Sequence, residues 1–233
     1  MNREELPCYS EIVTLDTYKL RSLKCQPDVI FDIGANLGMF TTFARELFPN
    51  ALIVAVEPHP PNFAFLTKNT PHENAVFLEK AIGRGQILRY PDIQATDESQ
   101  LVTGETYISS GSGYELPDIA DHPLAPVATR SVMLDELYAE YAKPGDKFIV
   151  KIDCEGAENV LFVHPPSVEV LKQADFVTME LHPYWATREL DTWAEGQPHE
   201  DFAALAKRVE SMLAETHDCE YEPYMFYAWR RPC

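Results

Sequence analysis

Short apolar runs alternate with helical patterns over much of the chain. Continuous runs of five or six residues, rich in β-branched side chains, predict buried parallel strands at 29–33, 51–56, 148–152 and 176–181. Apolar positions at helical spacing predict helices at 37–47, 60–68, 157–163 and 201–215. Alternation of this kind is typical of βαβ units, so the sequence predicts a doubly wound α/β sheet.

The remaining segments are less regular. Residues 75–82 predict a third strand, and a turn at Gly83-Arg-Gly85 predicts that 86–90 returns beside it as a hairpin. Alternating large apolar residues at 221–229 predict a final hairpin that closes the sheet. Residues 1–28 predict a helical or irregular cap before the core.

The apolar pattern is lost between residues 92 and 129, where Ser, Thr, Gly, Pro and acidic residues predominate. It resumes as a predicted helix at 132–138. A segment of this length without periodicity is either a functional lid or disordered, and we favour an inserted lid. With no repeat and no second boundary, the sequence predicts one domain over residues 1–233.

Charge and cysteine usage restrict the partners. The net charge of −18, from 37 acidic and 19 basic residues, disfavours nucleic acid and anionic membranes. The five cysteines are irregularly spaced, which favours free thiols in a reducing compartment, and we expect a cytoplasmic protein. No signal peptide or membrane-spanning apolar run is visible.

A glycine-rich turn, Asp32-Ile-Gly34-Ala-Asn36-Leu-Gly38, follows the first predicted strand and opens the first predicted helix. Glycines let the backbone approach a ligand, and the helix start offers unpaired amides. Glu57 ends the next strand, where a carboxylate accepts hydrogen bonds from ribose hydroxyls. Because the spacing is not G-x-G-x-x-G, the turn favours a nucleoside with an amino-acid tail. The structural alternative is a turn that only packs strand against helix.

Together with later motifs, this turn resembles the FkbM-like methyltransferases, a branch of the class I S-adenosylmethionine-dependent enzymes. The similarity spans about residues 28–182. The matching segments occur in the expected order, and they are Asp32–Gly38, Glu57-Pro58, Lys80–Gly83, Leu134–Leu137 and Lys151-Ile-Asp153-Cys-Glu155-Gly156-Ala-Glu158. The long 92–129 segment and the short N-terminal region depart from the family pattern.

The resemblance implies a Rossmann-like fold with a mostly parallel seven-stranded sheet and a reversed final strand. It also implies S-adenosylmethionine as cofactor. The expected contacts come from the glycine turn with Asp32, Gly34, Asn36 and Gly38, from Glu57 on the ribose with Pro58 after it, and from Ala81-Ile82 near the adenine. The implied reaction is methyl transfer to oxygen, commonly a hydroxyl of a sugar or secondary metabolite.

Acidic and histidine side chains at the ends of two strands are candidates for removing the acceptor's proton. They are Asp153, Glu155, Glu180 and His182. Asp153 ends a core strand, so we expect it to face the cofactor's methyl group or the acceptor. The ordinary pKa of histidine lies near working pH, so His182 suits a general base. The alternative is that His182 only caps a helix or supports a neighbouring side chain of the site.

Two features near these residues leave alternatives open. We expect no metal, but Asp153, Glu180 and His182 also suit a hard divalent cation. Lys151 lies within an apolar strand, either as a buried cation paired with Glu180 or Glu57 or as an edge residue that reaches solvent.

The sequence therefore predicts methyl transfer to a hydroxyl of a small molecule. One alternative is a methyltransferase-like scaffold that binds the cofactor without turnover. Another is a nucleotide-dependent oxidoreductase, against which the missing G-x-G-x-x-G motif counts. The sequence leaves the oligomeric state open.

Overall fold

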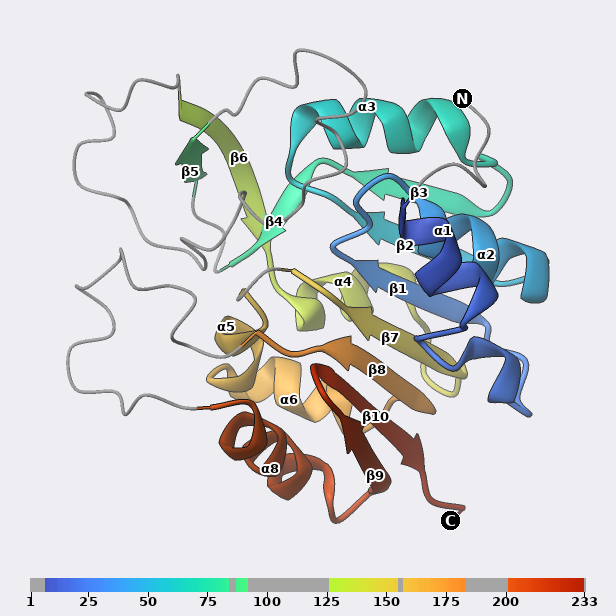
Figure 1. The fold of residues 1–233 in the computed structure, drawn as a ribbon, viewed down its shortest axis with the longest axis vertical. Coiled ribbons are helices and arrows are strands. Elements are labelled where there is room, and N and C mark those ends of the chain that lie inside the picture. Colours follow the sequence, from blue (N-terminus) through green and yellow to red (C-terminus); the bar gives the residue numbers. More distant parts are fainter. Residues whose placement is uncertain (1–6, 84–86, 92–125, 155–156, 183–200, 233) are drawn as a thin grey trace.

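A seven-stranded sheet forms the centre of the molecule (Figure 1). The computed structural model describes residues 7–83, 87–91, 126–154, 157–182 and 201–232. The strand order is β3-β2-β1-β7-β8-β10-β9, and β10 runs antiparallel to both of its neighbours. The bounds are β1 Val29–Ile33, β2 Leu52–Val56, β3 Ala75–Leu78, β7 Phe148–Ile152, β8 Phe176–Glu180, β9 His217–Glu222 and β10 Met225–Arg230. This confirms the expected mostly parallel sheet with a reversed final strand, closed by a C-terminal hairpin.

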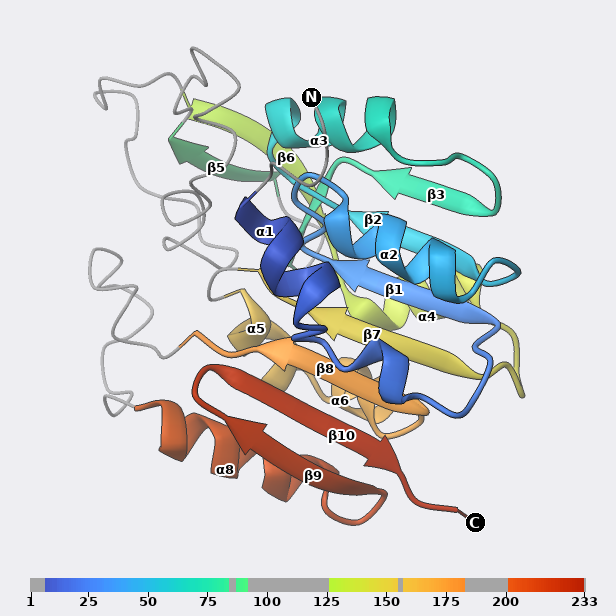
Figure 2. The ribbon, with the colours of Figure 1, turned by 45° about the vertical axis from the view of Figure 1, so that its right-hand side comes forward.

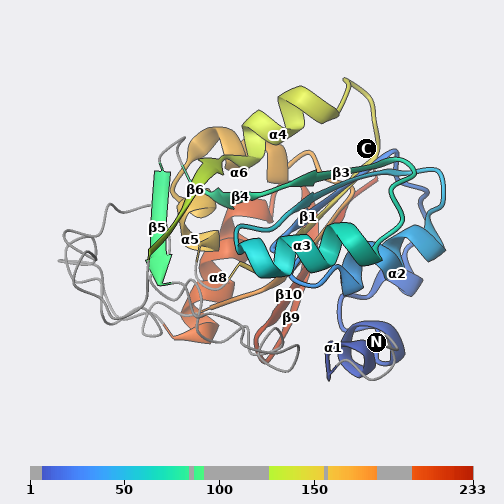
Figure 3. The same ribbon diagram turned by 90° about the horizontal axis from the view of Figure 1, so that it is seen from above.

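Helices cover both faces of this sheet (Figures 2 and 3). One face carries α2 Met39–Leu47, α3 Pro60–Asn69 and the N-terminal elements α1 Pro7–Tyr9, η2 Ser10–Thr14 and η3 Leu20–Ser22. The other carries α4 Leu134–Tyr141, α5 Glu158–Phe162, α6 Pro165–Leu171 and α8 Phe202–Leu213. Among the described residues, no helix is long and apolar enough to span a membrane.

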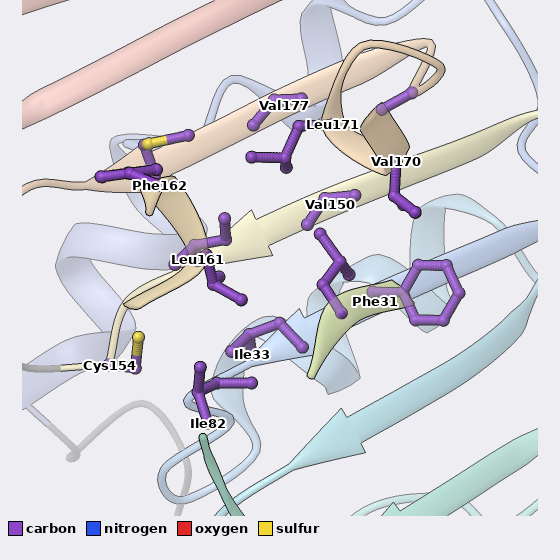
Figure 4. Close-up of a cluster of buried hydrophobic side chains, with 14 of the residues drawn as sticks. Phe31, Ile33, Ile82, Val150, Cys154, Leu161, Phe162, Val170, Leu171 and Val177 are labelled. Carbon is purple, nitrogen blue, oxygen red and sulfur yellow. The ribbon is translucent and has the colours of Figure 1, made fainter. Parts of the chain in front are cut away.

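Alternate residues of the central strands enter two different cores, which explains their continuous apolar runs. Phe31 and Ile33 pack with α4, α5 and α6, while Ile30 and Ile53 pack with α2 and the N-terminal elements. Figure 4 shows the first core, with Ile33, Ile82 and Cys154 gathered at one end of it. Both layers are therefore dry, and the polar residues of these strands stand out as exceptions.

The predicted hairpin of 75–82 with 86–90 is wrong. Residues 75–78 form β3 of the main sheet, whereas Lys80–Ile82 forms β4 of a separate three-stranded sheet with β5 Ile87–Pro91 and β6 Pro126–Val132. Strand β6 lies between the other two, parallel to β4 and antiparallel to β5. The glycine turn correctly predicts that β5 runs opposite to β4. It does not specify that both strands form their hydrogen bonds with the later strand β6 rather than with each other.

Strand β6 also shortens the segment read as a lid. Residues 126–129 belong to this strand, and the helix expected at 132–138 begins at Leu134. The sequence of β6, PVATRSV, has no clean alternation and follows a polar stretch, so its pattern gave no strand signal. Residues 92–125 of the predicted lid lie outside the described residues.

The packing of α5 on the sheet gives a stability prediction. Leu161 is fully buried in the first core, so Leu161→Ala is expected to lower the free energy of unfolding by about 2–5 kcal/mol. Urea denaturation followed by circular dichroism measures this. Val163, 48% exposed at the end of the same helix, provides the control, since Val163→Ala is expected to change stability by less than about 0.5 kcal/mol. Equal losses in both variants would contradict this packing.

Candidate active site

A cavity lies where β1, β2 and β7 end, between the main sheet and β4. Its empty space is about 600 Å³, including the part open to solvent. It brings together most of the residues predicted to bind the cofactor, namely Gly34, Asn36, Glu57, Pro58, Ala81, Ile82 and Asp153. Asp32 and Gly38, also predicted as cofactor residues, do not line it. Sequence reasoning missed the lining side chains of Asn62, Lys80, Cys154 and Ala157.

The two glycines of the turn have different structural roles. Gly34 has φ +77°, and a Cβ built there would lie 1.7 Å from the carbonyl oxygen of Asp153. Gly34 therefore lets the turn approach the end of β7 at the cavity. Gly38 has φ +82°, and a Cβ there would lie within 2.6 Å of Thr70 and Leu66 side-chain atoms. Gly38 thus allows α2 to pack near α3. For this glycine the structure therefore shows the packing role that was the alternative to ligand binding.

Glu57 is held rigidly at the cavity wall. Its Oε2 accepts a hydrogen bond from the Asn36 amide at 2.8 Å, and its Oε1 accepts one from the His59 amide at 2.9 Å. Burial raises the pKa of Glu57 from 4.5 to about 7, although these bonds, Lys151 and the Asn62 side chain favour the ionised form. The carboxylate is therefore oriented before any ligand arrives and titrates near neutral pH.

Asn62 adds an acceptor beside Glu57. The residue is 4% exposed and lines the cavity, and its side chain donates a hydrogen bond to Glu57. Its Oδ1 atom is buried without a hydrogen-bond partner in the described part of the chain. A buried acceptor without a partner is costly, so this atom suits a ligand that brings a hydroxyl or amino donor.

A buried ion pair lies directly behind the glycine turn. Lys151 and Asp32 are register partners on β7 and β1, with 3.2 Å between Nζ and Oδ1, and both side chains are almost fully buried. Nζ also donates to the carbonyl oxygen of Gly34 at 2.6 Å and lies 3.6 Å from Oδ2 of Asp153. Burial alone would lower the pKa of Lys151, but Asp32 and Asp153 outweigh it and raise the pKa.

This pair corrects the expected partners of Lys151. Lys151 is a buried cation, as one alternative proposed, but its ion pairs in the described structure are with Asp32 and Asp153, not with Glu180 or Glu57. Asp32 also accepts a hydrogen bond from Thr41 on α2 and is fully buried. In the structure it holds Lys151 and α2 and does not line the cavity, and its role in cofactor binding stays a prediction.

Tyr18 is a site residue that carries no sequence signal. Its hydroxyl donates to Oδ2 of Asp153 at 2.8 Å across 135 positions of sequence. Burial and the nearby carboxylates of Asp153 and Glu180 raise the pKa of Tyr18 well above its usual value. The phenol therefore stays protonated as a donor, and with Lys151 it orients Asp153 at the rim.

Asp153, Glu180 and His182 gather at the ends of β7 and β8, as predicted. One potential ligand atom from each lies within 4.8 Å of the other two. Glu158, fully buried at the start of α5, accepts from the backbone amide of His182 at 2.7 Å and contacts its Nδ1 at 2.9 Å. Glu155, the fourth predicted catalytic residue, lies outside the described residues.

A match over most of the chain shows which protein family it belongs to. A family model described as the methyltransferase FkbM domain matches residues 32–222. The chain belongs to the FkbM methyltransferase family. The match covers the glycine turn, the cavity and the cluster around Asp153, and it confirms the resemblance.

Individual relatives of this FkbM-family chain share low sequence identity with it or match only a short part of it. Methyltransferase sdnD of Sordaria araneosa is 27% identical over 191 residues, which cover 74% of this chain and 70% of the relative. The 31-O-demethyl-FK506 methyltransferase FkbM of Streptomyces tacrolimicus is 44% identical over 62 residues, 26% of this chain and 24% of the relative. A solved precorrin-6y C5,15-methyltransferase from Geobacter metallireducens is 14% identical, covers 94% of this chain and 87% of its own, and has a TM-score of 0.41.

The ion pair behind the FkbM-family turn gives a second prediction. Lys151→Met leaves the carboxylate of Asp32 buried without its cation, so the free energy of unfolding is expected to fall by about 3–5 kcal/mol. The double variant Asp32→Asn with Lys151→Met removes both charges and is expected to recover part of this loss. Urea denaturation measures all three proteins.

Lys68→Met supplies the control, because Lys68 is an exposed lysine on α3. It is expected to change stability by less than about 0.5 kcal/mol. If Lys151→Met costs no more than Lys68→Met, the buried pair does not hold the rim together.

Proposed function

We propose that this protein transfers a methyl group from S-adenosylmethionine to a hydroxyl oxygen of a small molecule. The observation that carries the cofactor assignment is the oriented carboxylate of Glu57 at the cavity wall, held by the Asn36 and His59 amides. A carboxylate in this place after the second strand suits the two hydroxyls of a ribose. Membership of a methyltransferase family supports the same cofactor.

The chemistry of the residues that line the cavity suits this cofactor. Oδ1 of Asn62 lacks a partner in the described part of the chain and would accept from a ribose hydroxyl or the adenine amino group. Ala81 and Ile82 are 4% and 3% exposed and offer an apolar wall for the adenine ring. Gly34 lets the backbone come close to the amino-acid tail. Asp153 marks the side of the cavity toward which we place the methyl group.

The chain's own residues would then align the acceptor and receive its proton. Bound S-adenosylmethionine supplies an activated methyl group on a sulfonium, which leaves by in-line displacement. Tyr18 and Lys151 hold Asp153 in one orientation, and Glu158 does the same for His182. We assign the proton lost by the acceptor hydroxyl to the cluster of Asp153, Glu180 and His182.

Two observations favour a small hydroxylated acceptor. The name of the FkbM relative from Streptomyces tacrolimicus describes methylation of an oxygen of FK506, and that relative is 44% identical over 62 residues. The net charge of −18 repels polyanions and so favours a small molecule over nucleic acid. The name of the relative supports an oxygen acceptor, and the net charge supports a small one.

Calorimetric titration with S-adenosylmethionine tests the cofactor assignment. Micromolar binding is expected, and Glu57→Ala is expected to weaken it about tenfold or more, the scale of a hydrogen bond to a charged group. Glu46→Ala, an exposed acid on α2, is the matched control and should leave affinity unchanged. No binding by the wild-type protein would refute the proposed function.

The pH dependence of this binding is a separate prediction. Ribose hydroxyls donate to the ionised carboxylate, and Glu57 has a pKa of about 7. Affinity should therefore be highest above pH 7 and fall about tenfold between pH 8 and pH 6 as Glu57 is protonated. Titrations across this range measure the step, and Glu57→Gln should remove it. A step of equal size in Glu57→Gln would assign the titration to another group.

Turnover separates an enzyme from a cofactor-binding scaffold. A panel of hydroxylated sugars and secondary metabolites is incubated with S-adenosylmethionine, and S-adenosylhomocysteine release is measured. Release that depends on an acceptor supports methyl transfer, and mass spectrometry of the product identifies the methylated atom. Cofactor binding without release on any acceptor favours the scaffold, and methylation of nitrogen or carbon would contradict the oxygen assignment.

A further inference from the structure

The cluster of Asp153, Glu180 and His182 has the composition and spacing of a metal site. Asp153 follows β7, and Glu180 and His182 come from the end of the adjacent strand β8. One ligand atom from each lies within 4.8 Å of the other two. Two carboxylate oxygens and one imidazole nitrogen form a ligand set suited to divalent cations such as Mn²⁺.

The distance between two of these ligands is compatible with a shared cation. Nε2 of His182 lies 3.9 Å from Oε1 of Glu180, too far for a hydrogen bond. Two ligands bound to one ion at about 2.1 Å lie roughly 3 Å apart at right angles and about 4.2 Å apart when opposite. The observed separation falls within this span, so both atoms can reach the same cation with little movement.

Glu158 orients the imidazole from outside the ligand set. Its Oε1 contacts Nδ1 of His182 at 2.9 Å and accepts from the His182 amide at 2.7 Å, and the side chain is fully buried. A carboxylate at Nδ1 keeps the proton there and places the lone pair on Nε2, the nitrogen nearer Glu180. Carboxylate–histidine pairs of this kind commonly support metal-binding histidines.

Asp153 is oriented in the same way. Its contacts with Tyr18 and Lys151 both use Oδ2, at 2.8 Å and 3.6 Å. Within the described contacts this leaves Oδ1 for the cation. The two carboxylates bring two negative charges against one divalent ion, and the partial exposure of all three ligands leaves room for an exogenous oxygen.

We propose that Asp153, Glu180 and His182 bind one divalent cation of the Mn²⁺ or Mg²⁺ class beside the cofactor cavity. The use of the ion rests on the proposed function, whereas its binding does not. The ion would coordinate the acceptor hydroxyl and lower its pKa. The oxygen–carbon bond would then form as the carbon–sulfur bond breaks, and the electron pair of that bond would stay on sulfur. With the ion bound, Asp153, Glu180 and His182 are ligands rather than proton acceptors, so the hydroxyl proton would pass to water instead of to the cluster.

The test uses the full chain and Mn²⁺ as probe. Calorimetry and electron paramagnetic resonance are expected to show one bound Mn²⁺ per chain. Glu180→Gln and Asp153→Asn should each weaken binding at least tenfold, and Glu158→Gln about tenfold through misorientation of His182. Because buried Glu158 also contributes to packing, circular dichroism melting checks that the Glu158→Gln variant is folded. The deciding result is Mn²⁺ binding by Glu180→Gln, since the Glu180 side chain is partly exposed. Glu169→Gln, an exposed acid on α6, should leave binding unchanged.

The outcomes separate this proposal from the proposed function. Absence of Mn²⁺ binding overturns the metal site. Weakening of Mn²⁺ binding by Glu180→Gln that is no larger than that by Glu169→Gln also overturns it, because the ion is then held by the general acidic surface. The same variants are titrated with S-adenosylmethionine, and Glu180→Gln should retain wild-type affinity. If cofactor binding fails while Mn²⁺ binds at this cluster, the proposed function is lost and the metal site remains.

Discussion

The rim of the sheet depends on one buried positive charge. Lys151 projects from the middle of an apolar strand and contacts groups on both sides of the site: Asp32, the Gly34 carbonyl and Asp153. A lone ammonium in such a layer would lose its proton, because burial penalises the charged form. Here the paired carboxylates outweigh burial and keep the lysine charged. The position of the glycine turn relative to β7 is consequently set by electrostatics as well as by packing.

Local sequence was enough to predict the sheet and most of the residues that line the cavity. The glycine turn, Glu57 and the segment at Ala81 are each readable in a short window, and parallel strands bring their ends together automatically. The same reasoning placed Asp153, Glu180 and His182 at neighbouring strand ends. These features follow from chain order alone, so no knowledge of side-chain packing was needed.

What the sequence did not show depends on contacts between distant segments. Tyr18 reaches Asp153 from the N-terminal cap, and no spacing rule connects the two. The partner of Lys151 was misjudged because only acidic residues at strand ends were considered as partners. Asp32 instead lies beside Lys151 within the pair of strands β1 and β7, as its register partner. Strand β6 was missed because a short polar strand becomes recognisable only through the partners it pairs with.

The division of residues 75–82 between two sheets separates the cavity wall from the length of the segment that follows it. Strand β4 lines the cavity with Lys80, Ala81 and Ile82, and its register is fixed by β6 rather than by the chain that joins β5 to β6. A longer joining segment adds little entropic cost, because closure entropy grows slowly with length. Insertions and replacements there can accumulate without moving Ala81 or Ile82. Changes in the length of the joining segment therefore leave the wall of the cavity formed by Ala81 and Ile82 in place.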